Sequence, residues 1–177
     1  MVGQVFAEWR NNPDGYRSRR WSHVIDDFEI DDSMKIYRGF DFGYSKPFAV
    51  VWIAIDHYGR AYIFKEYYGC TRTADTGVQM EPREIARRIR EIEKTDPQLK
   101  GKHIHGIADP AIWQETTGES IAEMMEREGV YFDKGDNTRL AGLMQMHYRL
   151  AFSEEGFPML YIFKSCSNII RTLPVPR

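Results

Sequence analysis

The sequence lacks an apolar run long enough to cross a membrane, and its first residues do not resemble a secretory signal peptide. It has only two cysteines, Cys70 and Cys166, and neither belongs to a C-x-x-C pair. This scarcity predicts reduced thiols in a cytosolic chain rather than a disulfide framework or a zinc site. The net charge of −2 gives no general support for nucleic-acid binding, so any basic surface has to be local.

The sequence also lacks the motifs of ATP-using enzymes. The triplet Asp41-Phe42-Gly43 matches the metal-binding triplet of protein kinases, but residues 1–40 contain no G-x-G-x-x-G, V-A-I-K or H-R-D. No G-x-x-x-x-G-K-[ST] loop occurs either. What remains is a strand-like run that delivers a carboxylate and then turns at a glycine. Open α/β sheets place their ligands at such strand ends.

The 177 residues suffice for one well-buried domain, with residues 1–34 as a mixed lead-in segment. Short links predict that three successive strands pair antiparallel; they are expected at 36–42, 48–56 and 61–68. Beyond residue 80, helical and strand patterns alternate. Helices are expected at 81–94, 116–129, 137–156 and 165–173, the last capped by Ser165, and strands at 103–109, 130–132 and 159–163.

The order of these elements predicts an α/β fold. The helix at 81–94 can carry the chain back across the sheet and place strand 103–109 parallel to strand 36–42. The expected fold class is therefore a ribonuclease H-like mixed sheet, in which three antiparallel strands are followed by parallel strands and helices cover both faces.

Two aspartates close hydrophobic strands in this arrangement. Asp41 ends the first strand, and Asp109 ends the parallel one just before Pro110. Parallel neighbours lie about 4.8 Å apart, so both carboxylates would reach the same edge. Two such carboxylates repel each other, and a divalent cation relieves that repulsion. The pair favours a metal site, although either aspartate alone would more simply cap a turn.

Several segments resemble the nuclease domain of the tailed-bacteriophage terminase large subunit. They are "GFDFGYSKPFAVVWIAID", "YIFKEYY", "IADPAIW" and "DNTRLAGLMQMHYRL", within residues 35–155. The resemblance implies a metal-dependent endonuclease that cuts concatemeric double-stranded DNA with two ions, Mg²⁺ or Mn²⁺. It implies Asp41 and Asp109 as catalytic metal ligands. It also implies an ATPase domain in the parent chain, a small terminase subunit, a portal protein, and action in the cytoplasm of the infected host cell.

One ligand of the family's site is missing from its expected place. The third acid belongs on a helix near the C-terminus, where "SCSNIIRTL" offers no carboxylate. We expect it beyond Arg177, with Asp136 and Glu154 as the nearest substitutes within the sequence. Lys46, Lys134 and Arg139 are candidates for contacts with DNA phosphates.

Two other functions stay open at this point. The same fold could serve as a non-catalytic DNA clamp or motor-docking module, because the third acid is not found. An ATP-using domain of the actin and sugar-kinase type would also begin its sheet with a D-x-G-like turn. That enzyme class needs a second such domain, which 177 residues do not supply.

Overall fold

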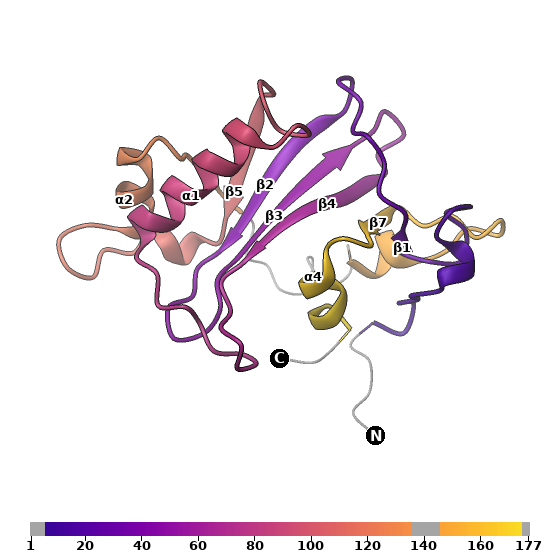
Figure 1. Cartoon of the computed structure of the whole chain (residues 1–177), viewed down its shortest axis with the longest axis horizontal. Helices are drawn as coiled ribbons and strands as arrows, with labels where there is room; N and C mark the ends of the chain where they lie inside the picture. The colour runs from indigo at the N-terminus through magenta and orange to yellow at the C-terminus, as the bar shows by residue number, and fades with distance from the viewer. Residues whose placement is uncertain (1–5, 136–145, 175–177) are drawn as a thin grey trace. The chain divides into compact units, whose positions relative to one another are not determined.

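The computed structural model describes residues 6–135 and 146–174. Within them, seven strands form one sheet in the order β1-β7-β4-β3-β2-β5-β6 (Figure 1). The strands are β1 (Val24–Ile25), β2 (Lys35–Asp41), β3 (Ala49–Ile55), β4 (Ala61–Tyr68), β5 (Ile104–Ala108), β6 (Asp133–Lys134) and β7 (Leu160–Phe163). The helices are α1 (Pro82–Thr95), α2 (Ile121–Arg127) and α4 (Ser167–Thr172), with 3-10 turns η1 (Pro13–Gly15) and η2 (Pro110–Trp113). Residues 146–150 are also helical.

The sheet is mixed, as the sequence predicts. The backbone N–H of Asp56 donates to the carbonyl of Arg60 at 3.1 Å, which closes the turn between β3 and β4 and makes them antiparallel. β2 and β5 pair in parallel, and so do β5 and β6 and the strands around β7. The ribonuclease H-like class is therefore confirmed, and its parallel half sets the positions of the candidate site.

The chain divides into two compact units. The first comprises Met1–Lys35, Trp52–Glu66 and Thr138–Arg177, and the second comprises Ile36–Val51 and Tyr67–Asn137. In the first unit, Val24 and Ile63 both pair with Ile162, so β7 lies between β1 and β4. Buried aromatic and aliphatic side chains of these strands, Phe163 among them, form its core.

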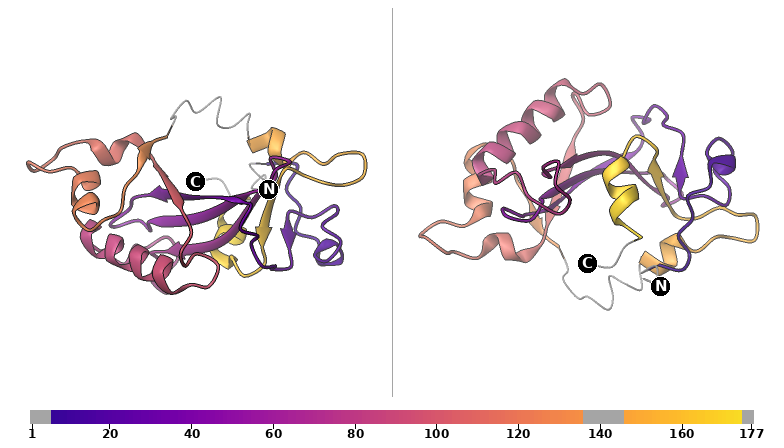
Figure 2. Two further views of the ribbon diagram at one scale, coloured as in Figure 1. Left: turned by 90° about the horizontal axis from the view of Figure 1, so that it is seen from above. Right: turned by 60° about the horizontal axis from the view of Figure 1, so that its bottom comes forward.

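The second unit places α1 against one side of β2 and β5 (Figures 1 and 2). Pro82 begins the helix, where its missing N–H costs nothing. Ile85, Ala86 and Ile89 are fully buried at helical spacing, so this stripe faces the sheet. The opposite stripe of α1 carries charged residues. This leaves the other side of β2 and β5 uncovered by α1.

Several predicted boundaries were wrong. α2 begins at Ile121 rather than 116, because Gly118 has φ +85° and Ser120 caps the helix through a reciprocal capping box with Glu123. The strand expected at 130–132 lies at Asp133–Lys134. The helix expected at 137–156 is helical only over 146–150 within the described residues, and its predicted cap, Asn137, lies outside them.

The start of α4 also differs from the prediction. Its N-cap is Cys166 instead of Ser165, and no side chain at the cap accepts a hydrogen bond. The carboxylate of Glu66 on β4 does so instead, accepting from the backbone N–H groups of Asn168 and Ile169 at 2.7 and 2.8 Å. None of the helices in the described part of the chain has the length and apolar character that a bilayer crossing needs.

Candidate active site at the ends of β2 and β5

The parallel pairing of β2 and β5 determines where the two aspartates lie. The last paired partners are Phe40 on β2 and Ala108 on β5. Asp41 and Asp109 are the next residues on their strands, so they follow the pair in the same register. Alternation along β2 buries Phe40 and leaves Asp41 exposed, and Asp109 is exposed as well. Two solvent-accessible carboxylates thus meet at the carboxyl edge of the second unit's parallel strands.

Asp109 has a structural task in addition. Its Oδ1 accepts a hydrogen bond from the backbone N–H of Ala111 at 2.8 Å, which caps the 3-10 turn that Pro110 begins. A carboxylate has two oxygens and about four acceptor sites, so this bond leaves capacity for a cation. The cap fixes the orientation of the carboxylate at the strand end. The capping role and the metal role are therefore compatible.

The loop that follows Asp41 is tightly constrained. A Cβ on Gly43 would lie 2.4 Å from the carbonyl oxygen of Lys46, so only glycine fits this turn. The backbone N–H of Gly77 donates to the carbonyl of Ser45 at 2.7 Å and anchors the loop from the other side. A Cβ on Gly77 would lie 2.2 Å from the carbonyl oxygen of Tyr44. Lys46 stands exposed on this fixed loop.

β6 extends the same edge on the other side of β5. Lys134 is exposed and pairs with Ala108, the residue before Asp109. Its Nζ lies 5.5 Å from the ring centre of Trp113, a cation–π contact that holds the ammonium group near the edge. Arg139, the third residue proposed to bind DNA, lies outside the described residues.

The structure adds an acidic residue that the sequence analysis missed. Asp133 on β6 pairs with Ile107 and forms an ion pair with His105, at 2.9 Å between Oδ2 and Nε2. It was overlooked because the strand was expected at 130–132, which left Asp133 in a loop. The alternation of β5 places His105, Ile107 and Asp109 on one face, so the ion pair lies on the face that carries the two aspartates.

The substitutes for a third acid are not brought to this edge. Asp136 lies outside the described residues, and Glu154 belongs to the first unit, where it is exposed in a turn. Within residues 6–135 and 146–174, no group of three or more His, Cys, Asp or Glu side chains is arranged to hold a metal ion. The described part of the site is therefore the Asp41 and Asp109 pair.

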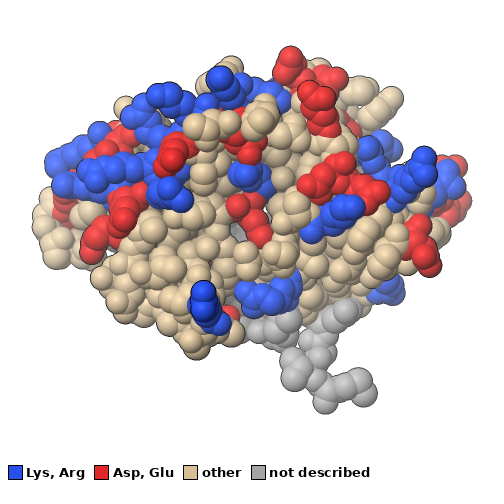
Figure 3. Space-filling model, in the orientation of Figure 1, with Lys and Arg blue, Asp and Glu red and all other residues tan. Residues whose placement is uncertain are grey.

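The arginines of α1 form ion pairs with α2. Arg87 donates to both carboxylate oxygens of Glu128 at 3.1 Å, and Arg83 contacts Glu119 at 3.3 Å. The ion pair lowers the pKa of Glu128 and raises that of Arg87, because each charge stabilises the other. Basic and acidic side chains are accordingly mixed over this region (Figure 3). This stripe is a paired surface rather than an open track of positive charge.

Comparisons with known proteins agree on the fold. No family model matches the sequence, and no curated protein matches it. The large terminase of a thermophilic bacteriophage, crystallised with and without nucleotide, aligns with 96% of this chain at a TM-score of 0.68 and 18% identity. The P22 large terminase nuclease domain aligns with 99% at 0.63 and 12% identity. The large terminase nuclease from thermophilic phage G20c, solved with bound cobalt, aligns with 98% at 0.52 and 14% identity.

The covered lengths show which part of those proteins is similar. The chain spans 36% of the large terminase that was crystallised with nucleotide, and 80% of each of the P22 and G20c nuclease chains. At such low identity the similarity concerns the fold alone. The chain therefore has the fold of a phage large terminase nuclease domain.

Proposed function

We propose that this chain is the metal-dependent endonuclease domain of a DNA-packaging terminase and cuts concatemeric double-stranded DNA. The observation that carries the proposal is the register of β2 and β5, in which Asp41 and Asp109 directly follow the paired residues Phe40 and Ala108. The fold shared with terminase nuclease domains supports the same reaction class. It also favours a nuclease over an ATP-using domain.

The donor set at the edge suits a hard divalent cation. Asp41 and Asp109 offer carboxylate oxygens, which Mg²⁺ and Mn²⁺ prefer, and both are accessible to solvent. Bound ions would supply an activated water and charge stabilisation for the leaving 3′ oxygen. Asp41 would contact two ions and Asp109 one. The cobalt in the G20c nuclease supports a divalent ion in this fold.

The remaining residues at this edge would hold the substrate. Lys46 on the fixed loop and Lys134 on β6 are exposed cations that flank the two carboxylates along the chain and sheet. Together with Arg139 they would neutralise DNA phosphates. Such contacts position the duplex without reading its bases, so we expect little sequence dependence of cutting.

The wider assembly follows from the same proposal. The chain spans 36% of the nucleotide-bound phage large terminase, so the remainder of such a protein would supply the ATPase domain. A small terminase subunit and a portal protein would be its partners, in the cytoplasm of the infected host cell. A third acid, Asp136 or one contributed from beyond Arg177, would complete the metal site.

One observation favours a second candidate function. The described residues hold two site carboxylates instead of a group of three. A domain that kept the fold but lost a ligand would act as a DNA clamp or a docking module. The two candidates differ in whether the chain breaks a phosphodiester bond.

Plasmid nicking separates them. The chain is incubated with supercoiled plasmid and Mn²⁺, with Mg²⁺ or with a chelator, beside the variants Asp41→Asn and Asp109→Asn. Asp14→Asn, an exposed aspartate of the first unit, is the matched control. Nicking that needs the metal, persists in the control and disappears in both site variants supports the nuclease. DNA binding without metal-dependent nicking supports the clamp.

A further inference from the structure

A cavity of about 590 Å³ opens beside α1 in the second unit. Residues of α1, of β2 and of the segment after α2 line it: Arg38, Arg87, Arg90, Glu91, Glu93, Lys94, Glu128, Gly129 and Val130. Arg38 alternates with Gly39 and Asp41 along β2, so it lies on the face opposite to the candidate active site. The cavity is therefore separate from the two aspartates.

Arg38 lies at the base of this cavity and is 6% exposed. Its Nη1 donates to both oxygens of Glu93, with Oε2 at 2.9 Å, and its Nη2 donates to the carbonyl of Tyr131 at 2.8 Å. Its Nε is buried and has no hydrogen-bond partner among the described residues. A buried guanidinium donor without an acceptor is costly, and a bound oxygen atom would satisfy it.

The charges around the cavity do not cancel. Glu93 neutralises Arg38, Glu128 neutralises Arg87, and Glu91 pairs with Arg88 at 3.1 Å on the outer side of the helix. Arg90 contacts only the neutral backbone carbonyl of Glu128, at 3.1 Å. Lys94 forms no ion pair among the described residues. Two cations, four residues apart on one side of α1, thus lack a carboxylate partner.

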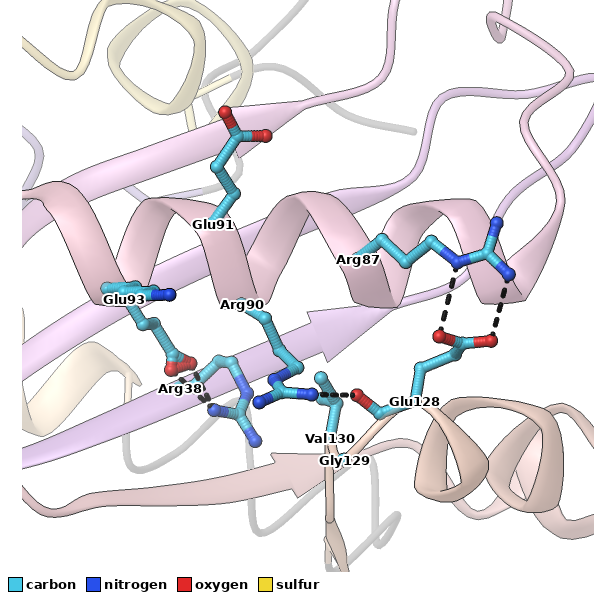
Figure 4. Close-up of a pocket in the computed structure, with 9 residues that line it drawn as sticks. Arg38, Arg87, Arg90, Glu91, Glu93, Glu128, Gly129 and Val130 are labelled. Atoms are coloured by element: carbon cyan, nitrogen blue, oxygen red, sulfur yellow. Dashed lines mark hydrogen bonds and ion pairs between the residues drawn. The ribbon is translucent and has the colours of Figure 1, made fainter.

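The close-up view shows how these groups converge. The side chains of Arg38 and Arg90 reach the same region below α1, while Glu91 points to the opposite side (Figure 4). Gly129 leaves room there, since a Cβ at that position would lie 3.1 Å from an Nη atom of Arg90. The space between the two guanidinium groups is thus kept open by a glycine and bordered by positive charge.

We propose that this cavity binds an oxyanion of the phosphate class. Its oxygens accept hydrogen bonds from Arg90 and from the buried Nε of Arg38, and Lys94 adds a second uncompensated charge. Phosphate suits this arrangement because it presents several strong acceptors to donors that arrive from two elements. The ligand is either a free phosphate or phosphomonoester, or a backbone phosphate of nucleic acid. The site does not depend on the proposed nuclease activity.

Calorimetric titration with inorganic phosphate, at constant ionic strength, tests the site. Lys94→Gln and Arg90→Gln remove its two uncompensated charges, and Arg88→Gln removes an exposed arginine of the same helix that does not line the cavity. Each lost charge-assisted bond should weaken phosphate binding about tenfold, whereas the Arg88 variant should bind like the wild type. Circular dichroism checks that every variant stays folded. Equal losses in all three variants, or no saturable binding by the wild type, would overturn the proposal.

Arginine side-chain NMR adds a readout that does not depend on a variant. Phosphate should shift the Nε–H resonance of Arg38, while that of Arg88 should stay in place. A second titration uses a blunt DNA duplex without terminal phosphates. A shift of Arg38 by the duplex identifies the backbone phosphate as the ligand, and a shift by inorganic phosphate alone identifies the free anion. An Arg38 resonance unmoved by both probes would contradict the site.

Discussion

Asp41 and Asp109 come from strands that are far apart in the sequence, yet each directly follows a partner of the same β-bridge, Phe40 with Ala108. This relationship is a property of the backbone, because a parallel ladder fixes which residues leave the sheet together. The side chains need no rearrangement to face the same solvent region. The metal hypothesis depends on it.

The two tasks of Asp109 can be separated by substitution. Asp109→Asn keeps an oxygen that accepts from the N–H of Ala111, whereas Asp109→Ala removes it. We expect both variants to lose metal-dependent cleavage, and the alanine variant alone to lose about 1 kcal/mol of unfolding free energy. Urea denaturation and plasmid nicking on the same preparations measure the two effects. Wild-type cleavage by Asp109→Asn would exclude the carboxylate as a ligand.

Lys46 and Lys134 are predicted to bind DNA phosphates. Replacing either with glutamine should weaken binding to all sequences alike and should reduce the slope of log K against log salt by about 0.9. Fluorescence anisotropy with a short duplex at several salt concentrations measures that slope. Lys100→Gln, an exposed lysine after α1, is the control. A slope unchanged in the site variants, or lowered equally in the control, would argue against this surface.

The ion pair between Arg38 and Glu93 is largely buried, with side-chain exposures of 7% and 16%. Glu93→Ala would leave a guanidinium group buried without its counter-charge, so we expect a loss of about 3 kcal/mol in unfolding free energy. Arg88→Ala breaks an exposed pair on the same helix and should cost less than about 1 kcal/mol. Denaturant midpoints compare the two. Equal small losses would show that water compensates Arg38.

His23 should make the protein sensitive to mild acid. Its Nδ1 accepts from the backbone N–H of Arg10 at 2.9 Å, and its Nε2 donates to the carbonyl of Leu150 at 2.7 Å, so the folded state holds the neutral ring. Burial lowers the pKa of His23 from its ordinary value of 6.5. Below about pH 6.5 the unfolded chain takes up a proton that the folded chain refuses. Stability due to this residue is therefore present above that pH and declines as the pH falls toward the lowered pKa.

The test compares unfolding free energies at pH 7.5 and 5.5. His23→Gln should be less stable than the wild type at pH 7.5, and the gap should narrow at pH 5.5, since the variant has no ring to protonate. His57→Gln, at an exposed position, should leave the pH dependence unchanged. A gap of the same size at both pH values would show that His23 does not titrate in this range.

The sequence was most informative where a hydrophobic run ends at a clear signal. β4 lies at Ala61–Tyr68, as its aromatic and β-branched composition predicts, and β5 ends just before Asp109 and Pro110. The parallel partnership of β2 and β5 followed from chain order and crossover geometry. These features place the two aspartates, so the described part of the candidate site was predictable.

What failed depended on contacts between residues distant in sequence. The carboxylate of Glu66, on a strand far before α4 in the chain, satisfies the first N–H groups of that helix, and nothing local to Ser165 indicates this. β1 and β6 contain two residues each, too short for a periodic pattern to identify. Asp133 was missed for that reason.

The location of the metal tests the central claim most directly. Crystals grown or soaked with Mn²⁺ and measured at its absorption edge give the ion's position independently of activity, and Asp41→Asn is the control. We expect an anomalous peak within bonding distance of carboxylate oxygens of both Asp41 and Asp109, and a loss of that peak in the variant. An ion bound elsewhere, or no peak at this edge at saturating Mn²⁺, would contradict a metal centre built on these two residues.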